Sequence, residues 1–397
     1  MAYISDTFEV DGLPRNGITA SLYSAGAFSP SPPIKGQALP VGAAIATAVT
    51  GPAFGHDGAY WFSVSTGSYV VAFSWNGTTY YHVHEGTATT TASVKAYGAV
   101  GDGITDDTAA IVAALADTAL GLLYFPPGSY LSTGNTIASR TGLIIEGQGA
   151  TIVLSGSGSS GVPRAAFSFS GTCRDITIRC LRVLGNNTAA SYHTGIKVPT
   201  GVTLEKLTID GCHFEQTAMG VHINSASGVM VDFRITNCRF EEMVGVGTSQ
   251  GRGVYCSYSA AFPLMLTIDR CDFETCSAHG VQVAQADGVL IEGNVFQNHR
   301  SATFTGTLTP AVLLQKGENQ RVAGNRFTDY SDGAIGVLPV GTRIHRVQID
   351  GNIFDDPANA LPAIQIGDTD PTSVETVEGV QILDNYYFAD AQATPFV

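Results

Sequence analysis

Short runs of alternating hydrophobic and polar residues recur along the later part of the chain. Their shared frame is an apolar residue, two variable residues, Cys or Asn, one variable residue and then an aromatic residue. The aromatic residues fall at positions 214, 240, 273, 296, 327, 354 and 387, so successive copies are 23 to 33 residues apart. The runs are LTIDGCHFEQ (207–216), FRITNCRFEE (233–242), LTIDRCDFET (266–275), VLIEGNVFQN (289–298), RVAGNRFTDY (321–330), VQIDGNIFDD (347–356) and a looser VQILDNYYFA (380–389). A period of two predicts strands, and the repetition predicts a stack of similar units.

A second short strand is expected between consecutive copies. These segments are GIKV (195–198), GVHI (220–223), GVYC (253–256), GVQV (280–283), AVLL (311–314), AIGV (334–337) and AIQI (363–366). One unit of two or three short strands cannot bury its own apolar face, whereas stacked units form a continuous core. The pattern therefore predicts an all-β fold, a single-stranded parallel β-helix, in which the variable spacing reflects loop insertions.

One column of small polar residues supports this arrangement. It consists of Cys212, Cys238, Cys271, Asn294, Asn325, Asn352 and Asn385. At an inward corner these groups can hydrogen-bond along the stack, as Asn ladders do. Packing inside the coil accounts for most of the cysteines better than catalysis or metal binding does.

The first 90 residues have a different pattern and predict a small antiparallel β domain. Strands are expected at ITASLYS (18–24), AYWFSV (59–64), SYVVAFSW (68–75) and TTYYHVHE (78–85). Asn76-Gly77 between the last two is a strong hairpin signal. TATTTASV (87–94) is interpreted as a linker, and residues 91–397 as the β-helix.

The stretch GDGITDDT (101–108) is interpreted as a turn and a helix N-cap. Thr105, Asp106 and Asp107 precede an amphipathic run in which Ile111 and Leu115 lie one turn apart, and Gly121 is expected to end it. The predicted helix, near 106–120, would cover the open end of the first coil. The stretch lacks the basic residue of a phosphate loop and the closing Glu of an EF-hand.

Charge and composition limit the classes of molecule that the protein is expected to bind. The formal net charge is −14, which argues against nucleic acid and against an anionic membrane surface. The start, MAYISDTFEV, has no basic and apolar segment typical of a signal peptide, and no apolar run reaches transmembrane length. The seven cysteines show no CxxC pairing, which argues against a disulfide framework.

VKAYGAVGDGITDDTAAIVAAL (94–115), LYFPPGSYL (123–131) and the following coils resemble the pectate-lyase-like right-handed parallel β-helix superfamily. With the short β module in front, the chain looks most like the bacteriophage tailspike or virion-appendage members. That resemblance implies a homotrimer on the virion, made in the host cytoplasm, that binds bacterial capsular polysaccharide or lipopolysaccharide and often cleaves it. It also implies that residues 1–90 attach the protein to the virion. The chain lacks the Asn-Thr-Asp and paired Asp of the galacturonan hydrolases, and the lone His279-Gly280 lacks their downstream Arg-x-Lys.

Catalytic candidates come from outward columns of carboxylates between 207 and 275. They are Glu215, Glu241, Asp269, Asp272 and Glu274. Equivalent positions on adjacent coils are about 4.8 Å apart, which suits a retaining pair at about 5 Å, and diagonal or two-coil pairs suit the roughly 6.5–9.5 Å of inverting enzymes. A solvated acidic face is the structural alternative.

Binding candidates come mainly from the second strand and from the loop SYHTG (191–195). They are Tyr192, His193, His222, Tyr255, His279 and Gln282. Polar and aromatic residues in a row suit a glycan, although ordinary surface is an alternative. GTSQGRGVYCSYSAAF (247–262) is a second possible wall. No cofactor and no metal ligand is predicted, and a metal bound by His82 and His84 on a trimer axis is the weaker alternative to a solvated hairpin tip.

Three functions remain open at this point. They are a polysaccharide depolymerase, acting as hydrolase or lyase, a receptor-binding module without turnover, and a purely structural spike. Carboxylates in a cleft beside His222 and Tyr255 would favour the enzyme, whereas carboxylates on the opposite flank would count against it.

Overall fold

The computed structural model describes most of the chain. Its described residues are 2–388 except 8, 11–12, 15, 17, 25–43, 45, 51–58, 65–68, 77, 85–88, 160–162, 187–191, 226–228, 244–250, 259–264, 300–308, 331–332, 341–342, 356–362 and 368–376. The chain divides into two compact units. The first comprises residues 1–93 with 119–124, and the second comprises 94–118 with 125–397.

The first unit is built mainly of antiparallel strands. They are β1 (Ala2–Thr7), β2 (Glu9–Val10), β3 (Leu13–Pro14), β4 (Thr19–Ser24), β5 (Ala46–Val49), β6 (Ala59–Val64), β7 (Tyr69–Trp75), β8 (Thr78–His84) and β9 (Thr89–Ser93). β7 and β8 pair up to Trp75 and Thr78, as the Asn-Gly signal predicts, and Asn76 has a φ of 48°. Of the linker predicted at 87–94, residues 87–88 lie outside the described part of the chain, and the prediction is wrong for 89–93, because β9 pairs in parallel with β11 (Leu120–Phe125). Its Thr-rich composition suits a strand as well as a loop.

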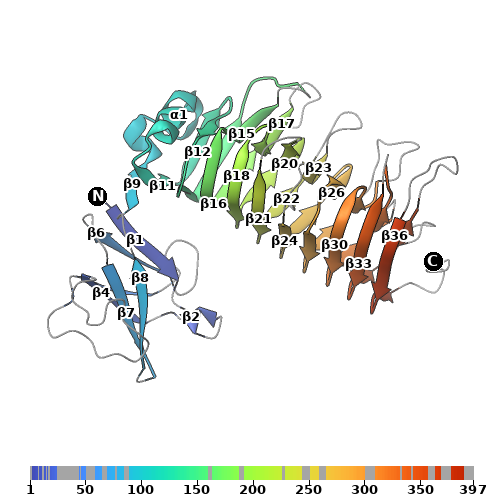
Figure 1. Ribbon diagram of the computed structural model, residues 1–397. Coiled ribbons are helices and arrows are strands. Elements are labelled where there is room, and N and C mark those ends of the chain that lie inside the picture. The colour runs from blue at the N-terminus through green and yellow to red at the C-terminus, as the bar shows by residue number, and fades with distance from the viewer. Residues whose placement is uncertain are drawn as a thin grey trace. The chain divides into compact units, whose positions relative to one another are not determined.

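The second unit is a parallel β-solenoid, drawn from α1 towards the C-terminal end in Figure 1. One ladder contains long strands, each followed from β18 on by a three-residue strand after a corner. The long strands are β10 (Asp102–Asp106), β12 (Gly128–Ser132), β14 (Ile144–Leu154), β16 (Thr172–Leu184), β18 (Thr203–Asp210), β21 (Met230–Thr236), β24 (Leu266–Asp269), β27 (Val289–Glu292), β30 (Gly317–Ala323), β33 (Ile344–Asp350) and β36 (Val377–Leu383). The short strands are β19 (His213–Glu215), β22 (Arg239–Glu241), β25 (Asp272–Glu274), β28 (Val295–Gln297), β31 (Arg326–Thr328), β34 (Ile353–Asp355) and β37 (Tyr386–Phe388).

A second ladder is a nine-stranded parallel sheet. Its strands are β13 (Thr136–Ala138), β15 (Arg164–Ser170), β17 (His193–Val198), β20 (Met219–Ser225), β23 (Arg252–Tyr258), β26 (His279–Gln285), β29 (Val312–Leu314), β32 (Ile335–Val337) and β35 (Ile364–Ile366). The predicted parallel β-helix is therefore confirmed, and the repeats found in the sequence pair coil by coil.

The aromatic column fills the interior. The rings of Phe240, Phe273 and Phe296 are stacked with centroids 4.7 Å apart, and none of the six Phe rings of this column, from Phe214 to Phe354, is more than 1 % exposed. The glycines that open the first four second-strand segments, Gly195, Gly220, Gly253 and Gly280, each lie against a ring of this column. A Cβ on Gly220 would lie 2.4 Å from Cδ1 of Phe240, so only glycine fits there.

The Cys and Asn column is inward, as predicted. Its amides donate to backbone carbonyls of the preceding coil. The Asn294 oxygen accepts the backbone N–H of Cys271, and the oxygens of Asn325, Asn352 and Asn385 each accept two N–H groups from the Asn before them. Asn294 Nδ2 lies 2.9 Å from the Ile268 oxygen, and the Asn325 oxygen lies 2.9 Å from both Asn294 nitrogens. The Cys271 thiol donates to the Ile235 carbonyl at 3.6 Å. These buried polar groups are thus satisfied inside the stack.

The helical prediction needs two corrections. After a 3₁₀ turn, η3 (Val94–Tyr97), the helix α1 runs only from Thr108 to Ala116, because Asp102–Asp106 pairs with β12. Asp107 does not cap the helix with its side chain, since its buried carboxylate accepts the N–H groups of Val100 and Gly101 at 2.6 and 3.1 Å. Ile111 and Leu115 are buried as predicted, and α1 packs against β13 of the first coil. Among the described helices, none is long and apolar enough to cross a membrane.

Candidate functional site

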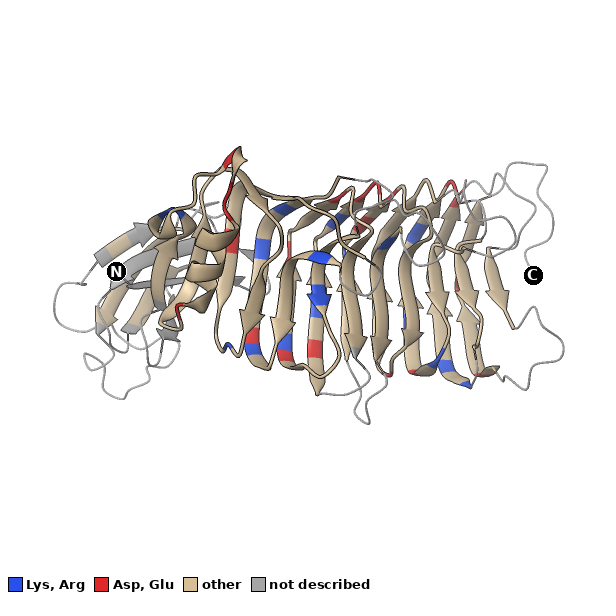
Figure 2. Cartoon of the chain, turned by 90° about the horizontal axis from the view of Figure 1, so that it is seen from above, with Lys and Arg blue, Asp and Glu red and all other residues tan. Residues whose placement is uncertain are grey.

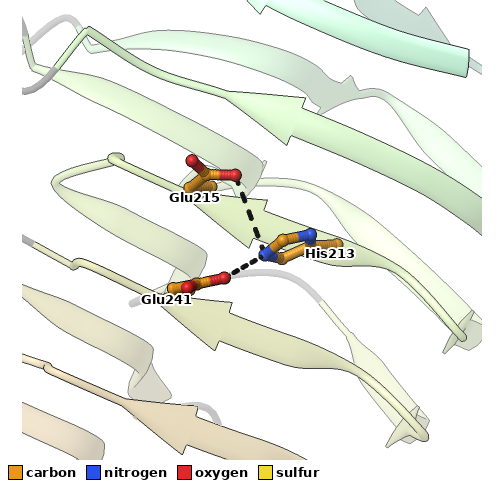
Figure 3. Close-up of side chains that lie close together, drawn as sticks. All are labelled: His213, Glu215 and Glu241. Atoms are coloured by element: carbon orange, nitrogen blue, oxygen red, sulfur yellow. Dashed lines mark hydrogen bonds and ion pairs between the residues drawn. The ribbon is translucent and has the colours of Figure 1, made fainter.

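Four of the five catalytic candidates lie together on the short strands β19, β22 and β25. His213, Arg239 and Asp272 occupy one outward column in register, and Glu215, Glu241 and Glu274 occupy the next. Each pair flanks an inward Phe, so the alternation of the strand directs these six side chains outward. We call these six residues the carboxylate cluster. Figure 3 shows that His213 lies between Glu215 of its own coil and Glu241 of the next coil.

Ion pairs connect the carboxylate cluster from coil to coil. Glu215 pairs with Arg182 of the preceding coil, and His213 Nε2 lies 3.0 Å from Glu241. Arg239 lies 2.7 Å from Glu274 and 3.3 Å from Glu241. In Figure 2, basic and acidic positions lie on neighbouring strands in several parts of the solenoid. Similar pairs join later coils, as between Arg326 and Asp355 at 2.6 Å. Cross-coil pairing is thus a general feature of this ladder.

Asp272 differs from the other carboxylates of the cluster. Burial raises its pKa, as do the nearby Glu274 and Glu241, while Arg239 opposes the shift. Its Oδ1 is buried and, within the described part of the chain, has no hydrogen-bond partner. Asp269, the fifth candidate, lies before the corner on β24, where its carboxylate pairs with Arg270 at 3.0 Å. Asp272 is therefore the group best suited to stay protonated and donate a proton.

A metal ion has one possible set of ligands among the described residues. The ligand atoms of His213, Glu215 and Glu241 all lie within 4.8 Å of one another (Figure 3). An imidazole and two carboxylates form a donor set that zinc accepts. Here the three side chains are occupied by contacts with one another and with Arg182 and Arg239, which would compete with a cation.

Three of the binding candidates form a second row, on the nine-stranded sheet. Lys197, His222, Tyr255 and Gln282 are in register on β17, β20, β23 and β26, and we call these four residues the polar row. The rings of His222 and Tyr255 meet edge to face with centroids 5.3 Å apart. Gln282 Nε2 donates to Gln315 at 2.7 Å.

Arg252 adds a charge that the sequence analysis missed. It opens β23, is buried, and its guanidinium lies 5.0 Å from the centroid of the Tyr255 ring. Burial lowers its pKa to about 10. Burial, followed by the charges of Lys197 and Arg252, lowers the pKa of His222 to about 4. The only available signal was its position in GRGVYC, directly before the repeated strand.

The other three binding candidates do not join the polar row. His193 Nε2 lies 2.9 Å from the Gly156 carbonyl, and buried His279 Nδ1 lies 2.7 Å from the Pro310 carbonyl. Tyr192 is half-buried just before β17. The predicted loop walls at 191, 247–250 and 259–262, and the side chains of His82 and His84, fall outside the described residues.

The side chains of the carboxylate cluster and of the polar row point outward on different sides of the solenoid. Phe214, between His213 and Glu215, points inward, so that a Cβ on Gly195 of β17 would lie 2.3 Å from its ring. His213 and Glu215 therefore point away from the nine-stranded sheet. His222 lies between the fully buried Val221 and Ile223, so it points out of that sheet.

Comparisons of this chain with known protein families and structures agree with the solenoid fold. A family model described as rhamnogalacturonase A/epimerase, pectate lyase-like, matches residues 91–335. No curated protein matches the chain.

Two similar solved structures come from viruses. ORF18 of Geobacillus virus E2 is 17 % identical with a TM-score of 0.51, over 81 % of this chain and 68 % of that one. The enzymatically active domain of tailspike protein 2 of bacteriophage CBA120 is 14 % identical with a TM-score of 0.54, over 80 % of this chain and 45 % of that one. At these identities the likeness concerns the fold. With most of its solenoid covered by the family model, the chain belongs to the pectate lyase-like rhamnogalacturonase A/epimerase family.

Proposed function

We propose that this chain is a bacteriophage spike protein that binds bacterial surface polysaccharide through the polar row. The observation that carries the proposal is the set of buried polar atoms on that row. His222 and Gln282 are 8 % and 7 % exposed, and within the described residues His222 Nδ1 and Gln282 Oε1 have no hydrogen-bond partner. Such atoms are costly unless a ligand or water satisfies them.

A glycan fits these groups chemically. Its hydroxyls donate to and accept from amide and imidazole groups, and the apolar face of a sugar ring packs on an aromatic side chain such as Tyr255. The adjacent coils place His222, Tyr255 and Gln282 at steps of about 4.8 Å, so the row runs along the solenoid as an extended chain would. The fold likeness to a phage tailspike supports the assignment to a virion.

The proposed assembly follows the same likeness. The protein is made in the host cytoplasm and carried on the virion as a homotrimer, and residues 1–90 attach it to a virion partner. Its net charge of −14 is consistent with a partner other than nucleic acid.

Binding is tested by retention on immobilised capsular polysaccharides and lipopolysaccharides from a panel of bacterial strains. Retention on at least one preparation, weakened at least tenfold by Tyr255→Ala, is the expected result. Tyr386→Ala is the matched control, since Tyr386 is exposed on the last short strand. No retention across the panel, or equal loss with both variants, would contradict the proposal.

Hydrolysis of the bound polysaccharide is the second candidate, and the raised pKa of Asp272 favours it. Asp272 would give its proton to the glycosidic oxygen as the bond to the anomeric carbon breaks. Glu241, on the adjacent strand and oriented by His213 and Arg239, would attack that carbon, and water would then release the sugar. The separation of the cluster from the polar row weakens this candidate relative to binding alone.

Release of oligosaccharides from the retained polysaccharide distinguishes hydrolysis from binding alone. A depolymerase would give fragments of fixed size, each heavier by one water, and Asp272→Asn would stop release while leaving retention intact. Retention without release by the unaltered protein would leave binding as the function.

A further inference from the structure

The polar row gathers positive charge on a protein that is otherwise acidic. Lys197, on the preceding coil, is in register with His222. Arg252 and Tyr255 are both on the following coil, where the guanidinium lies 5.0 Å from the centroid of the Tyr255 ring. Both charges act on His222, since each contributes to lowering its pKa. The chain as a whole has 34 acidic and 20 basic residues, so a local group of cations does not follow from composition.

These cations are held together at an electrostatic cost. Burial lowers the pKa of Lys197 as well as that of Arg252. Within the described part of the chain, no carboxylate forms an ion pair with Lys197, whereas Lys206 on the other ladder pairs with Asp175 at 2.9 Å. Partly buried like charges destabilise one another, and an anion bound between them would remove that cost.

A free inorganic anion would satisfy only part of this site. Gln282 Oε1 is buried and accepts no hydrogen bond from the described residues, so it needs a donor, which a sugar hydroxyl provides. The Tyr255 ring offers an apolar surface next to the cations. A negative group, a hydroxyl and an apolar ring face occur together in an anionic sugar.

We propose that the polar row, with Arg252, binds a negatively charged sugar residue, whose carboxylate or phosphodiester lies between Lys197 and Arg252 while a hydroxyl donates to Gln282. This inference rests on the proposed function and specifies its ligand class. It assigns the recognition of charge to the nine-stranded sheet, on a different side of the solenoid from the carboxylate cluster.

The test uses the full chain on an array of acidic and neutral bacterial polysaccharides. Binding to acidic members, reduced at least tenfold by Lys197→Met and by raising the salt concentration, is expected. Lys206→Met is the matched control, because it removes the same charge from a lysine outside the polar row. Thermal unfolding of both variants shows whether they remain folded, and Lys197→Glu supplies a second variant that should bind even less.

Chemical treatment of the bound polysaccharide identifies the charge. Reduction of carboxyl groups should abolish binding if a uronate is recognised, and cleavage with hydrofluoric acid should do so if a phosphodiester is recognised. Binding to neutral polysaccharides alone, or equal losses in Lys197→Met and Lys206→Met, would overturn the anionic sugar while leaving the glycan-binding function standing. Binding to no member of the array would overturn both.

Discussion

The carboxylate cluster and the polar row lie on the same stack of coils but differ in how their charged and polar side chains are paired. In the cluster, neighbouring coils supply opposite charges, so Glu215, Glu241 and Glu274 are each paired by Arg or His, and only Asp272 has a buried oxygen without a partner among the described residues. In the polar row, cations adjoin one another, and buried atoms of His222 and Gln282 lack partners among the described residues. Paired charges stabilise a solenoid surface modestly, whereas unsatisfied buried groups are the better indication of a ligand.

The largest expected effect comes from the aromatic column that separates the two regions. Phe273→Ala removes a fully buried ring stacked on two neighbours, and should lower the free energy of unfolding by about 3–5 kcal/mol. Chemical denaturation measures the loss, with exposed Tyr386→Ala as the control. A loss below about 1 kcal/mol would mean that the column does not hold the two faces together.

Acid should destabilise the solenoid through two buried histidines, His279 on the nine-stranded sheet and His299 just after β28. Burial lowers the pKa of His279 to about 3 and that of His299 to about 4. An unfolded histidine has a pKa of about 6.5, so the unfolded chain takes up protons first as the pH falls below that value. Stability is therefore unaffected above pH 6.5 and lost progressively towards pH 4, by about 2 kcal/mol for each histidine at pH 5.

Comparing unfolding at pH 8 and pH 5 checks this expectation. His279→Gln, which keeps a donor for the Pro310 carbonyl, should reduce the difference between the two pH values. His345→Gln, at a partly exposed histidine of β33, is the control. An unchanged difference in His279→Gln would count against a neutral buried imidazole at this position.

The smallest effect is expected in the carboxylate cluster. Arg239→Gln breaks two pairs of a half-exposed side chain, and should cost at most about 1 kcal/mol of stability, as should Arg326→Gln in a later coil. Equal losses would identify the cluster as ordinary cross-coil pairing. A clearly larger loss for Arg239→Gln would show a coupled network and strengthen the case for chemistry at Asp272.

Much of the solenoid was predictable because its interior repeats. The positions of Phe214, Phe240 and Phe273, and the polar column from Cys212 to Asn385, follow from a fixed frame in the sequence, and the structure stacks them coil on coil. Ends and boundaries were not predictable in this way. Residues 89–93, expected in a linker, form β9, and α1 ends at Ala116 before β11 begins at Leu120, because pairing with other strands decides both.

The sequence by itself determined which residues face inward, which face outward and which carboxylates fall in one column, since a period of two repeated in every coil encodes these relations locally. Only the tertiary structure decided which outward residues become neighbours. It places Lys197 and Arg252 around His222, partly buries Asp272 and separates the carboxylate cluster from the polar row. These relations depend on the register between strands whose paired residues are 25 and 33 positions apart, as for Lys197 with His222 and His222 with Tyr255, and on the direction of each face, which no local pattern contains.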